Sequence, residues 1–295
     1  MRVDRRTLLK TGAAAAAATA LPNGFAGSTA SAAREAKSFA EYLSDLGYEL
    51  IPPANLITGH SFNGGVSYDE GHDYHGGGAS GEPSKWFVLQ DCARLDDIAK
   101  RNEFGVLAYF HILGCTNNAP AHRGEVLEQI VKYLVGPAGL KPERFVLVAT
   151  ERGDGFLEQL EPFGFKRDQV VLRKLDDART AGDGSGYFKP DGHPMGQEFH
   201  TLSFHYAPEG KDLPSGRTYP LPGYLEIGEF LFEPQHKAAK DHESFGLGAE
   251  RLVMAQGKLA GDFNSSRERL LAKLRDDTKR NGLKLPNAYD NFSAL

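Results

Sequence analysis

The spacing of apolar side chains predicts a series of amphipathic helices. Phe39, Leu43 and Leu46 recur at helical intervals over residues 33–46, and Gly47 follows as a stop signal. The same criterion predicts helices at residues 125–135, 156–163 and 248–259, and a last one opened by Ser265 and Glu268 as a capping box.

Apolar runs of strand length alternate with these helices only in part. They predict strands at residues 48–51, 86–94, 106–115, 145–150, 170–175, 200–206 and 224–232. A charged stretch separates two of them, so residues 88–94 should pair antiparallel with residues 107–113. Glycine-rich polar stretches at residues 57–84 and 177–186 are interpreted as loops. Hairpins and loops join most strands, which favours an α+β fold with a mainly antiparallel sheet flanked by helices.

The N-terminus follows a different pattern. Arg5 and Arg6 stand before a short apolar pair and a lysine, an alanine-rich run covers residues 12–21, and Ala30-Ser31-Ala32 supplies small residues for cleavage. This order is that of a twin-arginine export signal. The alternatives are a disordered alanine-rich tail or a membrane anchor, but an anchor needs about 18 strongly apolar residues. We predict a signal at residues 1–32, one domain at residues 33–295, and a periplasmic, cell-surface or extracellular location.

The composition of the chain limits the classes of binding partner that are expected. The formal charge is −5 for 295 residues, and removal of the basic signal leaves the remainder more acidic, which argues against a nucleic-acid surface. No second apolar run is long enough to cross a membrane, so no membrane contact is expected after cleavage. The two cysteines, Cys92 and Cys115, match no zinc motif. They are either two buried thiols or one late disulfide.

Four segments carry a resemblance to a known family. Gly246-Leu247-Gly248-Ala249-Glu250-Arg251-Leu252 resembles the third signature motif of class II aminoacyl-tRNA synthetases. The run from Gln90 to Ile98 is similar to the first strand of their second motif, in the archaeal form of alanyl-tRNA synthetase. Residues 109–114 resemble the returning strand, and residues 224–227 the strand before the third motif. Order and spacing agree from about residue 33 to residue 257.

The resemblance implies adenylate chemistry, in which a carboxylate attacks the α-phosphate of ATP and fixed cations stabilise the developing charge. Arg94 matches the α-phosphate clamp, and Arg251 matches the arginine near the γ-phosphate, with its stem over the base. Phe110 matches the ring against adenine, and Asp96 the residue that limits the adenine side. Glu226 matches a position that holds Mg²⁺.

The third motif implies further nucleotide contacts. Gly246 and Gly248 would let the backbone pass close to ATP, and Glu250 belongs to the same implied nucleotide side. Each residue also has a structural alternative: the glycines could serve helix packing, and Glu250 could form a solvated pair with Arg251.

The amino-acid half departs from the family. Gly105-Val106 stands where the family has an arginine and a histidine, and Glu229 and Ser244 replace the two residues that meet the alanine ammonium. Phe188 replaces the tryptophan under the alanine pocket. Alanine is therefore not the expected substrate. We expect a different small amino or carboxylic acid instead.

Three functions remain open at this point. The first is ATP-dependent activation of such an acid, without housekeeping tRNA alanylation. We expect no tRNA-recognition, editing or oligomerisation segments, so tRNA is not an expected partner. The second is an exported, non-catalytic domain that binds an amino acid or a nucleotide. The third is a metal-dependent hydrolase that uses His72, Asp73 and His75, whereas His200 and His205 should point to opposite faces of one strand.

Overall fold

The computed structural model describes residues 30–53, 56–58, 61–62, 85–94, 96–189, 198–214, 217–232, 243–258 and 261–281. The signal before residue 30 and the segment with His72, Asp73 and His75 lie outside these residues. The α-helices are α2 (Ala30–Asp45), α3 (Glu125–Val135), α4 (Leu157–Leu160), α5 (Leu175–Ala181), α6 (Ala249–Ala255) and α7 (Phe263–Asn281). The 3-10 helices are η2 (Asp96–Lys100), η3 (Pro142–Arg144), η4 (Glu151–Phe156), η5 (Glu161–Phe163) and η6 (Arg167–Gln169).

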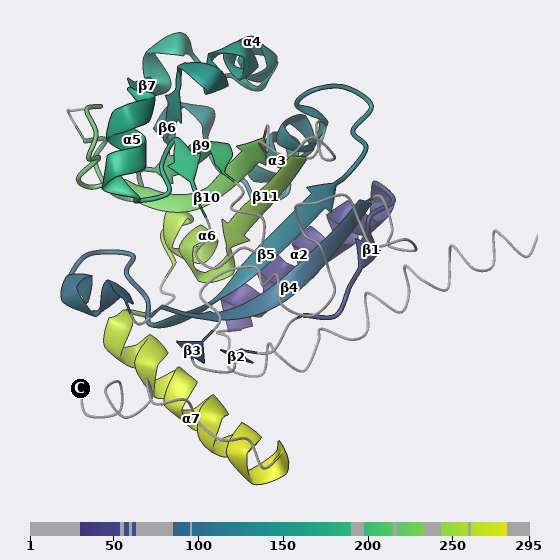
Figure 1. Cartoon of the computed structure of the whole chain (residues 1–295), viewed down its shortest axis with the longest axis vertical. Helices are drawn as coiled ribbons and strands as arrows, with labels where there is room; N and C mark the ends of the chain where they lie inside the picture. Colours follow the sequence, from purple (N-terminus) through teal and green to yellow (C-terminus); the bar gives the residue numbers. More distant parts are fainter. Residues whose placement is uncertain are drawn as a thin grey trace, which may run out of the picture.

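The strands form one large sheet and one small hairpin (Figure 1). They are β1 (Glu49–Leu50), β2 (Ile57–Thr58), β3 (Ser61–Phe62), β4 (Lys85–Ala93), β5 (Tyr109–Asn117), β6 (Phe145–Thr150), β7 (Val170–Arg173), β8 (Tyr187–Phe188), β9 (Phe199–Tyr206), β10 (Leu225–Phe232) and β11 (Glu243–Gly248). The large sheet has the order β1-β4-β5-β11-β10-β9-β6-β7, with β8 on β9, and β2 pairs with β3. Only β1–β4 and β6–β7 are parallel among the described pairs. The α+β prediction with a mainly antiparallel sheet is confirmed.

The predicted hairpin of β4 and β5 is also confirmed. The two strands pair antiparallel from Lys85 opposite Asn117 to Ala93 opposite Tyr109. The backbone N–H of Arg94 extends the pairing by donating to the carbonyl of Ala108 at 3.0 Å. Arg94 therefore leaves the sheet at a fixed point, directly after the last paired residue of β4.

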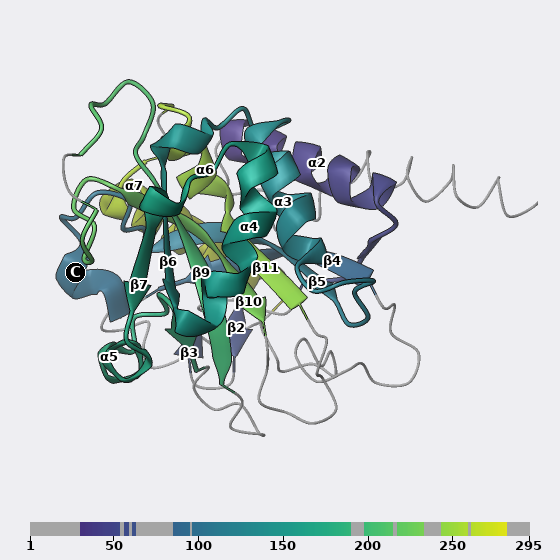
Figure 2. The same cartoon turned by 90° about the horizontal axis from the view of Figure 1, so that it is seen from above.

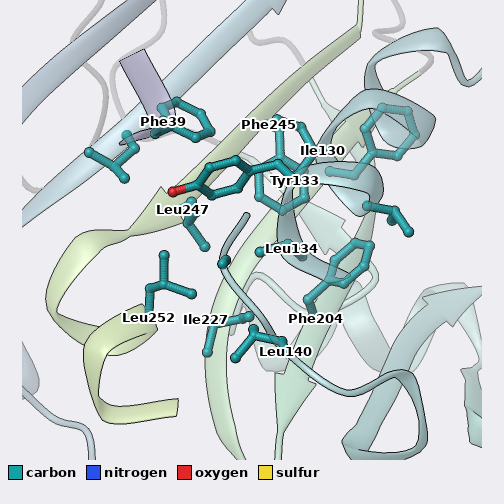
Figure 3. Packing of buried hydrophobic residues seen from close by; sticks show 14 of the residues in the cluster. Phe39, Ile130, Tyr133, Leu134, Leu140, Phe204, Ile227, Phe245, Leu247 and Leu252 are labelled. Atoms are coloured by element: carbon teal, nitrogen blue, oxygen red, sulfur yellow. The ribbon is translucent and has the colours of Figure 1, made fainter. Parts of the chain in front are cut away.

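One face of the sheet packs against helices α2, α3 and α6 (Figure 2). Phe39 of α2 and Tyr133 of α3 meet edge to face, with ring centroids 5.2 Å apart. Leu252 of α6 and Phe245 of β11 belong to the same buried cluster (Figure 3). Burial of apolar surface, worth about 25 cal/mol per Å², holds these helices to this face, which we call the first face.

Helix α7 packs against the end of β4 and the start of β5. Leu270 and Leu274 pack on Tyr109, and the backbone N–H of Ala108 donates to Ser266 Oγ at 2.9 Å. The helix begins at Phe263, so the predicted capping box of Ser265 and Glu268 is wrong. Asp262 Oδ1 instead accepts from the backbone N–H of Ser265 at 2.8 Å, which is the role of an N-cap carboxylate.

Two further expectations are corrected. The glycine-rich stretch interpreted as a loop contains α5, whose first turn carries Asp176 and Asp177 and whose end is set by Gly182 at φ 59°. The helix predicted at residues 248–259 begins as expected, because Gly248 ends β11 and is the N-cap of α6, but it ends at Ala255. The parallel pairing of β7 with β6 was not foreseen.

A β-bulge interrupts strand β10. Glu226 lies opposite His205, but Gly228, two residues on, lies opposite Phe204, the next residue of β9, so the alternation of side chains shifts at Ile227. Before the bulge Leu225 and Ile227 enter the core, and after it Phe230 and Phe232 do. A Cβ at Gly228 would lie 2.5 Å from the carbonyl oxygen of Gly246, so the bulge requires a glycine there.

Candidate functional site

The candidate residues gather on the face of the sheet opposite the helices, which we call the second face. It is defined by Phe110, Ile112, Ser203, Glu226 and Glu229, which alternate with core residues along their strands. Across the strands, Gly114 lies opposite Gly246, Gly246 opposite Glu229, and Glu229 opposite Ser203. Along this row, from β5 through β11 to β10, the two glycines have no side chains and Glu229 is the first residue with one. The backbone of Gly114 and Gly246 is therefore the surface of the second face next to Glu229, and we call it the glycine floor.

Two arginines meet at one aromatic ring. The guanidinium carbon of Arg94 lies 5.7 Å from the centroid of the Phe110 ring, and that of Arg251 lies 5.5 Å from the same centroid. Arg94 follows β4 and is exposed, Arg251 lies in the first turn of α6 and is largely buried, and Phe110 is buried. Three segments of the chain therefore combine an aromatic surface with two positive charges.

Arg251 is oriented by its neighbours. Its Nη1 donates to the backbone carbonyl of Glu226 at 3.3 Å and to Glu226 Oε2 at 3.4 Å. A Cβ at Gly248 would lie 3.3 Å from Cβ and Cδ of Arg251, so the absence of a side chain at Gly248 leaves space for the arginine stem. Gly246 differs, because a Cβ there would meet only Ile112 Cγ2, at 3.6 Å.

Glu229 lies between polar groups from neighbouring strands. Ser203 Oγ donates to Glu229 Oε1 at 3.0 Å, and a Cβ at Gly184 would lie 3.3 Å from the same oxygen. Burial and the nearby Glu226 carboxylate raise the pKa of Glu229 to about 8, although Ser203, Arg94 and Thr201 act in the opposite direction. Glu229 therefore holds a proton near neutral pH and can gain a charge when a cation approaches.

The other predicted substrate residues lie on the same side of the sheet at different positions. Ser244 faces Leu231 across β10 and β11, diagonally to Glu229, and its buried Oγ has no hydrogen-bond partner. Phe188 pairs with Phe199 near the start of β9. Asp96 is the first residue of η2, directly beyond the Arg94 end of β4.

Glu250 lies on the first face instead. It is fully buried, Oε2 accepts from the backbone N–H of His111 at 2.9 Å, and Oε1 lies 2.7 Å from His111 Nδ1. In this position Glu250 lies on the face away from the candidate nucleotide site, and it does not form the solvated pair with Arg251 that was the structural alternative. Asp91 Oδ1 contacts the other ring nitrogen of His111 at 3.0 Å. Sequence reasoning missed this network, although the alternation of β5 already separates His111 from Phe110.

A second missed cluster surrounds His205 on the second face. Arg173 forms an ion pair with Asp183 at 2.7 Å and lies over the ring of Tyr219, whose hydroxyl donates to Asp183 Oδ2 at 2.8 Å. Burial lowers the pKa of His205, so its ring is neutral, and its Nε2 has no partner. His200 lies on the opposite face, against Phe232, which confirms the predicted orientation of the two histidines.

The structure bears on the metal and cysteine predictions as well. Within the described residues, no three His, Cys, Asp or Glu side chains are grouped to hold a metal. Mg²⁺ that accompanies a nucleotide commonly uses only one or two carboxylates, which is compatible with Glu226. Cys92 and Cys115 are two buried thiols that are not joined in a disulfide, and they face opposite sides of the sheet. No helix in the described ranges is long and apolar enough to cross a membrane.

Comparison with known proteins identifies the N-terminal segment. Residues 2–22 match the TAT (twin-arginine translocation) pathway signal sequence, so the chain is exported by that pathway. No curated protein matches the chain by sequence.

Solved structures with a related arrangement include aminoacyl-tRNA synthetases. The apo histidyl-tRNA synthetase of S. aureus has a TM-score of 0.45 and 12% identity, covering 90% of this chain and 82% of its own. An aspartyl-tRNA synthetase of Entamoeba histolytica gives 0.38 and 13%, covering 86% and 59%. The asparaginyl-tRNA synthetase of that organism gives 0.38 and 13%, covering 77% and 64%. These TM-scores are too low to support an argument about the site, so the site is described from the contacts of this chain alone. The chain is an exported α+β domain whose motif order resembles that of class II synthetases.

Proposed function

We propose that the second face binds ATP and activates a small amino or carboxylic acid as an adenylate. The observation that carries this proposal is the convergence of Arg94 and Arg251 on the ring of Phe110. A ligand that fits there needs a flat ring and several negative charges, which are the two parts of a nucleoside triphosphate. Planar guanidinium groups suit phosphate oxygens because they donate two parallel hydrogen bonds.

We assign each residue a role in nucleotide binding or in stabilising charge. Phe110 supports the base, Arg94 meets the α-phosphate where charge develops, and Arg251 meets the terminal phosphate. The absence of a side chain at Gly248 leaves space for the Arg251 stem. Mg²⁺, when bound with the nucleotide, would neutralise phosphate charge, and we assign the Glu226 carboxylate to hold it.

The acid substrate belongs beside Glu229. The glycine floor leaves the Glu229 carboxyl as the first polar group on that side, and Ser244 adds a hydroxyl but no charge. An ammonium group would convert Glu229 to its charged form, because an opposite charge nearby lowers a carboxyl pKa. Both polar positions differ from those that the resemblance implies for alanine, so we propose that alanine is a poor ligand.

A second candidate is a binding domain without turnover. The family's arginine at the returning strand is replaced by Gly105, and a Cβ there would lie 2.1 Å from Leu225 Cδ1. A cationic side chain at this position would require Leu225 to shift and would be strained by the φ of 83°, and one phosphate contact implied by the resemblance is missing. Export also removes the chain from the cytosolic ATP pool. The hydrolase alternative depends on residues outside the described ranges.

Pyrophosphate exchange separates the two candidates. The signal-free domain is incubated with ATP, Mg²⁺, labelled pyrophosphate and a panel of amino and carboxylic acids. Label that enters ATP only with a particular acid supports activation. Binding of ATP without exchange for any acid supports the non-catalytic candidate. Absence of ATP binding refutes the nucleotide site itself.

A further inference from the structure

A buried charged network lies on the first face, directly behind the candidate site. His111 is fully buried between two carboxylates, with Nδ1 2.7 Å from Glu250 Oε1 and Nε2 3.0 Å from Asp91 Oδ1. Tyr109 donates its hydroxyl to Asp91 Oδ1 at 3.0 Å, and Lys273 Nζ lies 3.2 Å from Asp91 Oδ2. The groups come from β4, β5, α6 and α7, and the proposed chemistry uses none of them.

Three members of the network are near neighbours of nucleotide-site residues in the sequence. His111 follows Phe110 on β5, Glu250 precedes Arg251 on α6, and Asp91 precedes Arg94 near the end of β4. We propose that His111 is a positioning residue that fixes the first turn of α6, and hence Arg251, against the β4–β5 hairpin that carries Arg94 and Phe110. This inference rests on the proposed function, because it concerns the geometry of the same nucleotide site.

The two carboxylates favour a doubly protonated ring. The Tyr109 hydroxyl lies 3.4 Å from His111 Nε2 but closer, at 3.0 Å, to Asp91 Oδ1, to which it donates. Both ring nitrogens face carboxylate oxygens, and only the imidazolium form offers two N–H donors. Burial disfavours the charged ring, but Glu250 and Asp91 outweigh burial and raise the pKa of His111 to about 9. Loss of the proton would leave a ring lone pair facing a buried carboxylate, which is strongly unfavourable. The connection between β5 and α6 should therefore weaken above this pKa.

The test compares His111→Gln with His122→Gln, which alters an exposed histidine next to Glu128. ATP affinity is measured by calorimetry between pH 7.5 and 10. We expect the parent and His122→Gln to lose about tenfold in affinity as the pH passes 9. His111→Gln should bind about tenfold more weakly at pH 7.5 and show little further change.

Asp91→Asn provides a second test that does not depend on the fold of the glutamine variant. It removes one of the two carboxylates, so the midpoint of the affinity loss should move to lower pH. An unchanged profile in either His111→Gln or Asp91→Asn would overturn the proposal. If the parent binds no ATP, the proposed function fails, and hydrogen exchange in α6 decides the positioning role. Exchange in α6 that is equal in His111→Gln and His122→Gln at every pH would refute it.

Discussion

Glu226 and Glu229 project from the same face of β10 although they are an odd number of positions apart. The bulge at Ile227 shifts the alternation, so one glutamate faces His205 and the other faces Ser203 on the same side of β9. In a regular strand one of the two would enter the core. The bulge therefore places two carboxylates together beside the arginine pair.

The pKa of Glu229 predicts a pH-dependent stability. Its pKa in the folded protein is about 8, above the ordinary value, so the folded state binds more protons than the unfolded state between about pH 4.5 and pH 8. Its contribution to stability is present below this window and is lost as the pH rises through it. Glu229→Gln, which keeps the neutral shape, should exceed the parent in stability at pH 8.5 by at least about 1 kcal/mol. Urea unfolding at pH 5 and pH 8.5 checks this, and equal pH slopes in both proteins would contradict it.

The bulge predicts a contrast between two glycines. Gly228→Ala brings a methyl group within 2.5 Å of the Gly246 carbonyl oxygen, so the free energy of unfolding should fall by about 2–4 kcal/mol. Gly246→Ala, the matched control, meets only Ile112 at 3.6 Å and should cost about 1 kcal/mol or less. Thermal unfolding measures both. Equal losses would show that the bulge does not require its glycine.

The arginine pair predicts the cost of losing one phosphate contact. Arg251→Ala should weaken ATP binding by about ten- to a hundredfold, because a charge-assisted hydrogen bond contributes about 1.5–3 kcal/mol. Arg217→Ala removes a partly exposed arginine that pairs with Asp168, and it should leave the affinity unchanged. Calorimetry that returns the parent affinity for Arg251→Ala would eliminate this site.

Ser244 predicts a change of specificity. A carboxylate introduced by Ser244→Asp would lie diagonal to Glu229 and could pair with an α-ammonium, so alanine affinity should rise relative to the parent. Ser244→Ala removes a buried hydroxyl that has no partner and should not reduce stability. Amino-acid titrations of all three proteins are the measurement. Tight alanine binding by the parent would show that the pocket is wrongly aligned.

The position of α2 changes the expected cleavage site. The helix begins at Ala30, and Ala32 is fully buried in the main core. Twin-arginine substrates cross the membrane folded, and a peptidase needs an accessible, extended segment. We therefore expect processing before Ala30 rather than after Ala32, so that the exported chain retains residues 30–32. Intact mass and N-terminal sequencing determine the end, and a new N-terminus at Ala33 would reject this expectation.

The sequence predicted those elements whose signals are local. The amphipathic helix α3 and the continuous apolar strand β6 were predicted with their observed bounds. α5 was missed because its polar residues and nearby glycines are equally typical of a loop. The bulge was missed because it depends on the fit between Gly228 and Gly246 across two strands.

In the candidate site, too, residues within local motifs were predicted and long-range contacts were not. Arg94, Phe110 and Arg251 were identified from motif order, and the structure brings them together. Their roles toward ATP remain predictions. Glu250 was predicted as a nucleotide contact, and its burial on the first face was missed because its partner His111 is 139 positions away in the sequence. Long-range pairs of this kind leave no local pattern to detect.

The opposite orientation of Cys92 and Cys115 makes the two thiols reporters of when the chain folds. Both are at most 1% exposed, and burial raises the pKa of each thiol. Because they face different sides of the sheet, an alkylating reagent reaches both only when the packing on both faces is lost. A precursor held in the cytoplasm after folding should therefore resist labelling at both positions, and one delivered unfolded should accept two labels. The number of labels on the trapped precursor would show whether the chain folds before or after it is delivered to the membrane.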